Sequence, residues 1–222
     1  MGLRALRGAR SPWLLAPGWA EHGRCEPSGL PARGPGGRAG GIKKRVNERV
    51  ILDVRDLGAC SRLSPGVCAY LGEAASVVLG AFHAPPPPPT PAALFDGEAR
   101  HEAALVWRAP DPVQRGSHAN ELEVVRDGAC AVAIAAVHAH AGYLVRKRPR
   151  HGSGADYLMT RVGDEEESFV RLEVSGTARG DALELRARMA QKRAQLRAGR
   201  EEGPAVAVVV AFKDAVIRME DA

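Results

Sequence analysis

One run of eight apolar residues constrains the fold of this chain more than any other feature. After Pro204, the residues from Ala205 to Phe212 are apolar without interruption. A strand with one face in water alternates apolar and polar residues, whereas a strand buried on both faces is continuously apolar. We therefore expect this run to be an internal strand of a sheet that is covered by helices.

The segments before this run predict the order helix, three strands, helix, strand. A helical pattern over residues 122–141 is closed by Gly142, and a second helix runs from Asp181 to about Ala198. Three extended segments lie between them, and a further edge strand is expected after the apolar run; these segments cover residues 143–147, 156–161, 168–175 and 215–219. Hairpin loops are expected at residues 152–154 and 164–167. Local hairpins with one crossover helix indicate an α/β (α+β) protein with a mixed central sheet flanked by helices.

The first half of the chain divides into two parts. Residues 1–44 are rich in Gly, Arg and Pro and predict a disordered tail, although an over-extended start codon would look the same. Residues 45–115 predict a strand-helix-strand extension, with a strand at 49–54, a helix starting after Ser64 and a short strand at 104–107. The proline run from Pro85 is more typical of a surface loop than of a ligand for a partner's aromatic groove. Residues 116–222 then form the core.

Composition narrows the class of protein. Hydrophobic residues make up 45% and charged residues 26%, as in soluble globular proteins, and the net charge of +5 favours an anionic partner. No apolar run approaches the roughly 18 residues of a membrane span. The four cysteines form no CxxC pair and have no zinc spacing, and Pro17 interrupts the apolar stretch near the start too early for an export signal. We therefore expect a cytoplasmic protein.

Two acidic residues occupy places where a carboxylate needs a partner. Asp156 opens the second extended segment, and Glu173 interrupts the apolar residues of the third. An antiparallel hairpin between these segments would place the two residues opposite each other. A buried carboxylate is costly unless it is paired or bound to a metal. Two facing carboxylates make a hard, oxygen-rich site that is suited to Mg²⁺ or Mn²⁺.

A lysine in the following helix offers such a partner. Lys192 lies within the apolar stripe that Leu185, Met189 and Leu196 form at helical spacing, and Gln195 flanks it. Since that stripe should face the sheet, Glu173 is the expected partner of Lys192. A lysine that reaches solvent along the stripe, or an ion pair without a catalytic role, is the alternative.

Other patterns carry less weight. His138 and His140 are two positions apart, so on a helix they point in different directions and cannot chelate one ion. Ser175 lacks the Gly-x-Ser-x-Gly elbow of a nucleophile. Gly152 and Gly154 follow one strand and lead into another, which is not the context of a nucleotide-binding loop.

These motifs together resemble a known family. Gly152-Ser-Gly-Ala-Asp156-Tyr, then Arg171-Leu-Glu173-Val-Ser-Gly, then Lys192-x-x-Gln195 are similar to the restriction-endonuclease-like superfamily, the PD-(D/E)XK nucleases. The match is best to a bacterial branch with a GxGxDY … RLEVSG … K … Q pattern. The resemblance covers about residues 45–220, with its sharpest motifs between 151 and 195, and implies a nuclease-like core over residues 116–222.

The resemblance implies metal-dependent hydrolysis of DNA. Asp156 and Glu173 would hold Mg²⁺ or Mn²⁺, Lys192 would stabilise developing negative charge or orient the attacking water, and Gln195 would position Lys192 or the phosphate. The basic residues before the site would contact backbone phosphates; they are Arg146, Lys147, Arg148 and Arg150.

The chain departs from the family pattern in two places. Ser175 stands where the family usually has its lysine, two positions after the glutamate, so Lys192 would be a migrated lysine. The glutamate that the first helix often contributes has three possible substitutes here, Glu121, Glu123 and Asp127. The alternative function is a catalytically inactive member of the fold that binds DNA or protein, for example in a bacterial defence system. A homodimer and a protein partner both stay open.

Overall fold

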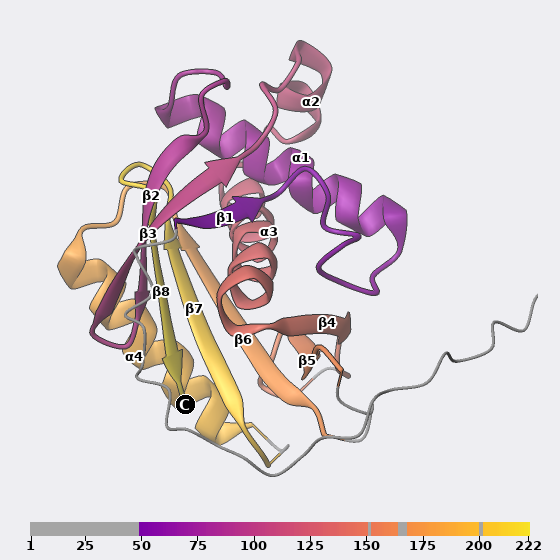
Figure 1. Cartoon of the computed structure of the whole chain (residues 1–222), viewed down its shortest axis with the longest axis vertical. Coiled ribbons are helices and arrows are strands. Elements are labelled where there is room, and N and C mark those ends of the chain that lie inside the picture. The colour runs from indigo at the N-terminus through magenta and orange to yellow at the C-terminus, as the bar shows by residue number, and fades with distance from the viewer. Residues whose placement is uncertain (1–48, 151, 164–167, 200–201) are drawn as a thin grey trace, which may run out of the picture. The chain divides into compact units, whose positions relative to one another are not determined.

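The computed structural model describes residues 49–150, 152–163, 168–199 and 202–222. Within the described ranges, residues 49–222 belong to one compact unit. The predicted tail, residues 1–44, and the predicted acidic turn, residues 164–167, lie outside the described residues. Figure 1 shows the elements, which in chain order are β1 (Val50–Asp53), α1 (Pro65–Phe82), β2 (Thr90–Asp96), β3 (Ala99–Val106), α2 (Pro112–Ser117), α3 (Glu121–Ala141), β4 (Tyr143–Lys147), β5 (Tyr157–Arg161), β6 (Val170–Thr177), α4 (Ala182–Ala198), β7 (Ala205–Ala211) and β8 (Val216–Asp221).

A mixed sheet of eight strands is the centre of this unit. Its strands lie in the order β1-β3-β2-β8-β7-β6-β5-β4. Three neighbouring pairs are parallel, namely β1 with β3, β2 with β8 and β6 with β7, and the other pairs are antiparallel. The predicted α/β class with a mixed sheet and flanking helices is confirmed, and so is the order α3, β4, β5, β6, α4, β7.

The sheet curls, because the segment after β1 reaches the strand at the opposite end of the strand order. Ser61 forms a parallel bridge with Val145 of β4. The Arg62 amide donates to the Val145 carbonyl at 2.7 Å, and the Val145 amide donates to the Cys60 carbonyl at 3.2 Å. Helix α3 therefore lies inside the curl, where it contacts β1, β4, β6 and β7.

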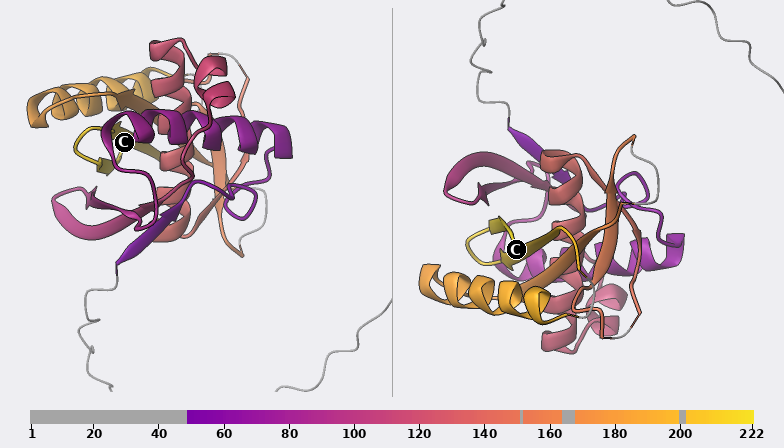
Figure 2. Two further views of the ribbon diagram at one scale, coloured as in Figure 1. Left: turned by 90° about the horizontal axis from the view of Figure 1, so that it is seen from above. Right: turned by 90° about the horizontal axis from the view of Figure 1, so that it is seen from below.

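Helices cover the two faces of the sheet unequally. Helix α3 packs on the concave face and α1 packs on α3, whereas α4 lies on the other side of β6, β7 and β8, as both views of Figure 2 show. Every residue of β7 is buried, as its apolar run predicts. One apolar cluster joins α1, α3 and the concave face, and a second joins the buried stripe of α4 to β7.

Helix α3 is apolar around its whole circumference between Ala129 and Val137 and buried there on all sides. Its ends are set by local hydrogen bonds. The side chain of Asn120 accepts from the amides of Leu122 and Glu123 at 3.2 and 3.4 Å, and Gly142 ends the helix with φ 69°. The predicted boundary at Gly142 is confirmed.

Three parts of the prediction were wrong or incomplete. The segment after β7 was predicted as an edge strand, but β8 lies inside the sheet between β7 and β2. Strand β2 follows the proline run directly and was missed, and β3 is longer than the predicted strand at 104–107. The short helix α2, which begins after the N-cap residue Asp111, was also missed.

Among the described helices, α1 is the one whose length and mean hydropathy would allow it to cross a membrane. A core helix of a soluble protein passes the same test. In this fold Leu71, Ala75 and Leu79 of α1 are fully buried, and the helix packs on α3.

Candidate active site

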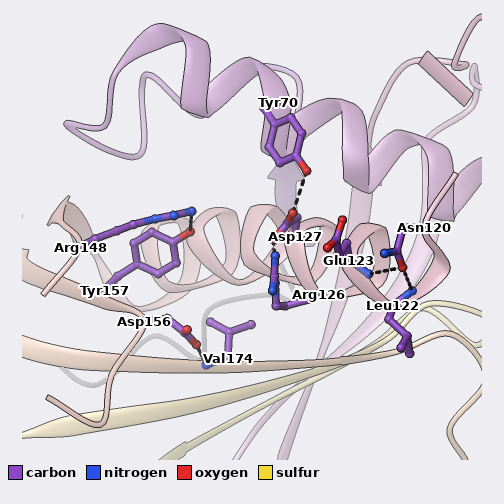
Figure 3. Close-up of polar contacts among 10 residues, drawn as sticks. All are labelled: Tyr70, Asn120, Leu122, Glu123, Arg126, Asp127, Arg148, Asp156, Tyr157 and Val174. Carbon is purple, nitrogen blue, oxygen red and sulfur yellow. Dashed lines mark hydrogen bonds and ion pairs between the residues drawn. The ribbon is translucent and has the colours of Figure 1, made fainter. Parts of the chain in front are cut away.

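The two predicted acids lie opposite each other in the β5–β6 hairpin. Tyr157 pairs with Leu172, so Asp156, the residue before β5, stands across from Glu173. The Asp156 amide donates to the Leu172 carbonyl at 2.9 Å, and the Val174 amide donates to Asp156 Oδ2 at 2.8 Å (Figure 3). The Asp156 carboxylate is therefore held against β6 by one of its oxygens.

Glu173 is the more buried of the two acids. Its side chain is 2% exposed. Burial and then the neighbouring charge of Asp156 raise the pKa of Glu173 to about 7, while the hydrogen bond from Lys192 acts in the opposite direction. The raised pKa means that the surroundings of Glu173 favour the protonated acid over the ionised carboxylate. An added cation between the two acids would relieve that repulsion.

Lys192 and Gln195 approach the acids from α4. Lys192 Nζ donates to Glu173 Oε1 at 2.6 Å and to Gln195 Oε1 at 3.3 Å. The predicted stripe of Leu185, Met189 and Leu196 is buried, and this packing turns the Lys192 side of the helix toward β6. The structure thus brings together all four residues that the sequence singled out.

Helix α3 contributes a third acid, Asp127. The residue is 5% exposed, and its two carboxylate oxygens accept from the Tyr70 hydroxyl and the Arg126 Nε, both at 3.0 Å. Figure 3 shows Arg126 and Asp127 on α3 above the strands that carry Asp156 and Val174. Glu121 and Glu123, the other two first-helix acids considered, are exposed.

A cleft of about 770 Å³ opens over these residues. Asp127, Asp156 and Glu173 line it together with Gln195. Within the described residues, however, no three His, Cys, Asp or Glu side chains come close enough together to form a metal-binding group. Of the described residues, the two facing carboxylates of the hairpin are the ones that would hold a metal ion.

The four predicted basic residues before the site separate into two pairs. Arg148 and Arg150 line the cleft, and Arg148 donates to the Tyr157 hydroxyl at 3.3 Å. Arg146 instead donates to Thr160 Oγ1 at 2.9 Å, and Lys147 lies over the Phe169 ring.

The glycine loop before Asp156 fits against the end of α4. Gly154 has φ +76°, and a Cβ there would lie 2.9 Å from the Gly199 Cα and 3.0 Å from the Gln195 carbonyl oxygen. A Cβ at Gly199 would meet the Ser153 carbonyl in turn. The backbone of the glycine loop therefore packs directly against the backbone at the end of α4. This close packing fixes the loop that carries Asp156 relative to the helix that carries Lys192. The glycines therefore position the site.

We expect Gly154→Ala to lower the free energy of unfolding by about 2–5 kcal/mol. The left-handed backbone costs roughly 1–2 kcal/mol for a residue with a Cβ, and the contact with α4 adds roughly 1–3 kcal/mol. Gly152→Ala is the matched control, because Gly152 has φ +87° but nothing within 4 Å of its Cβ position. Urea unfolding of both variants measures the difference, and equal losses would show that the loop does not press on α4.

The histidines, the serine and the described cysteines considered in the sequence make structural contacts. His138 and His140 have different partners, the Tyr143 carbonyl at 2.9 Å and Asp96 at 3.1 Å. Ser175 is buried and lies 3.3 Å from an Arg188 guanidinium nitrogen. The cysteines in the described residues, Cys60, Cys68 and Cys130, are free and buried.

Two neighbours of the site were not predicted, Tyr70 and Arg188. Arg188 lies one helical turn before Lys192, so the spacing of four was a signal that could have found it. Tyr70 comes from α1 and is 57 residues away from its partner Asp127, and no local pattern links them.

Comparison of the chain with protein-family models, with curated proteins and with solved structures gives no match. The class that the fold defines is a mixed α/β protein with a curled eight-stranded sheet flanked by helices. The site within it is a buried glutamate that stands opposite a half-buried aspartate and accepts a hydrogen bond from a lysine.

Proposed function

We propose that this protein is a metal-dependent nuclease that hydrolyses DNA phosphodiester bonds. The observation that carries the proposal is the 2.6 Å contact between Lys192 Nζ and Glu173 Oε1, made where Asp156 stands opposite Glu173. Glu173 is buried, and Asp156 and Lys192 beside it are half-buried, so placing these three ionisable groups together costs stability, and such a cost is typical of sites kept for function. The chain order α3, β4, β5, β6, α4, β7 supports the finer assignment to the restriction-endonuclease-like fold.

The residues fit Mg²⁺ or Mn²⁺. Mg²⁺ is usually bound through one or two carboxylates, with waters and substrate phosphates completing its shell, so two facing acids are sufficient. The pKa of Glu173 is raised first by burial and then by the charge of Asp156, and a dication beside the two acids would favour their ionised forms. When bound, the metal would polarise the scissile phosphate and lower the pKa of a coordinated water.

The protein's own groups divide the remaining work. Asp156 and Glu173 hold the cation, and the hydrogen bond from the Val174 amide fixes the orientation of Asp156. The ammonium of Lys192 stands beside the acids, where negative charge develops on the phosphate. Gln195 accepts a hydrogen bond from Lys192 and so limits the positions of its amine. Arg148 and Arg150 contact backbone phosphates at the rim.

One observation favours a second function, a DNA- or protein-binding member of the fold without catalysis. Lys192 already satisfies Glu173, as a purely structural ion pair would. The cytoplasm as the location, and DNA as the partner, are proposed for both functions.

The decisive experiment incubates the purified full chain with supercoiled plasmid in Mg²⁺, in Mn²⁺ and in EDTA. The nuclease is expected to nick or linearise the plasmid in either metal and to leave it intact in EDTA. An Asp156→Ala variant purified in the same way controls for a contaminating enzyme. DNA retention in EDTA without cleavage in any metal would instead support the binding protein.

A further inference from the structure

A second cleft adjoins the first at the acids. It has a volume of about 410 Å³ and lies between the N-terminal end of α3, the end of β6 and α4. Arg126 and Asp156 line both clefts, so the two meet there. Glu173 lines the first cleft and Lys192 lines the second. The Glu173–Lys192 contact therefore sits on the boundary between two open spaces.

Guanidinium groups lie in both clefts. Arg148 and Arg150 line the first, Arg188 lines the second, and Arg126 stands between them. Arg188 is held at 2.8 Å from Glu184 and 3.3 Å from Ser175, so its charge is fixed beside the opening. Fixed guanidinium groups at intervals along a path match the repeating charge of a phosphate backbone.

Neither cleft offers a surface for stacking bases. Tyr157 is the one aromatic residue among the described lining residues, and it is 1% exposed. Proteins that bind single strands through their bases use exposed aromatic side chains, and proteins that read duplex sequence place side chains against base edges. The arginines of the lining are suited to contacts with phosphates.

We propose that the backbone of one nucleic-acid strand crosses the acids from the first cleft into the second, held by phosphate contacts on both sides and without base contacts. The path rests on the nuclease function proposed above. Arg150 contacts phosphate on one side of the acids and Arg188 on the other. Binding by this path is independent of base sequence and weakens steeply with salt.

The test measures binding of fluorescein-labelled single-stranded oligonucleotides to the full chain by anisotropy, in EDTA, over a series of salt concentrations. Arg150→Ala and Arg188→Ala are each expected to reduce the slope of log K against log salt by about 0.7, the value for one lost phosphate contact on a single strand. Arg188→Lys keeps the charge and should keep the slope. Arg100→Ala, an exposed arginine on β3 that lines neither cleft, is the matched control and should change nothing.

The outcomes separate this path from the nuclease function. If Arg188→Ala has the same slope of log K against log salt as Arg100→Ala, the proposed path is overturned. This holds even if the wild-type protein cleaves plasmid. A preference of more than tenfold between oligonucleotides of different sequence also overturns it, since bases would then be read. Reduced slopes in both alanine variants support the path even if no metal produces cleavage, because EDTA binding needs no chemistry. Absence of any binding overturns it.

Discussion

Glu173→Gln is expected to reduce plasmid cleavage by at least about 1000-fold and, in the same variant, to stabilise the fold above neutral pH. The substitution keeps the shape of the side chain but removes one of the two charges that would hold the metal. Loss of several kcal/mol of charge stabilisation corresponds to roughly three powers of ten in rate. Cleavage is measured on supercoiled plasmid under single-turnover conditions.

The stabilisation follows from the raised pKa of Glu173. In the folded protein burial and Asp156 bring this pKa to about 7, whereas the unfolded chain has the ordinary value near 4.5. Between these values the folded state holds a proton that the unfolded state has lost. The favourable contribution of the protonated acid is therefore fully present below about pH 4.5 and is lost as the pH rises through 7. At about 1.4 kcal/mol per tenfold change in protonation, the loss is about 3 kcal/mol.

Glutamine does not ionise, so the variant should escape this loss. Urea unfolding at about pH 4.5 and about pH 8 should show a smaller decrease in stability for Glu173→Gln than for the wild type, by up to about 3 kcal/mol. Glu102→Gln, an exposed residue of β3, is the control and should alter neither property. A variant that is less stable at pH 8 and still cuts DNA would show that Glu173 serves the fold and not the chemistry.

The local parts of this site could be predicted because each carries its own physical signal. Glu173 interrupts an apolar strand, and a buried carboxylate needs a partner. The spacing of Leu185, Met189 and Leu196 fixed the face of α4, and hence the direction of Lys192. The register of the hairpin then followed from the two extended segments, since Asp156 and Glu173 fall opposite each other when Tyr157 pairs with Leu172.

The parts that depend on distant pairing could not be predicted. The neighbours of β8 are β7 and β2, and β2 lies about 120 residues earlier in the chain. Strand β2 begins directly after a proline run, a context that did not indicate a strand. The sequence also could not show which of the three first-helix acids, Glu121, Glu123 or Asp127, lies at the site. Helix α3 is apolar on all sides over much of its length, so no polar stripe marks the direction of the site. Asp127 differs from Glu121 and Glu123 in being buried and in accepting hydrogen bonds from Tyr70 of α1 and from Arg126.

Lys192→Met is expected to lower cleavage by about 100- to 1000-fold while leaving Mg²⁺ affinity equal to or higher than that of the wild type. The rate loss is that of removing one fixed electrostatic group from a site of developing charge. Methionine has a similar length and no charge, and the lysine side chain is only 19% exposed, so the substitution keeps the packing of α4 on β6. Arg193→Met, the next residue of α4, removes a charge that pairs with Glu220 instead and should cleave normally.

The opposite behaviour of rate and affinity distinguishes Lys192 from a merely structural residue. In the free protein the ammonium lies 2.6 Å from Glu173 Oε1, so it occupies one oxygen of a carboxylate that would hold the metal. A cation at the acids must therefore compete with this amine, and Lys192→Met removes the competitor. The same contact lowers the pKa of Glu173, so the variant should bind protons more tightly there. Calorimetric titration with Mg²⁺ is therefore done at about pH 9, well above the wild-type pKa of about 7. Unchanged cleavage would remove Lys192 from the chemistry, and weakened Mg²⁺ binding at that pH would show that the amine supports the metal site instead of competing with it.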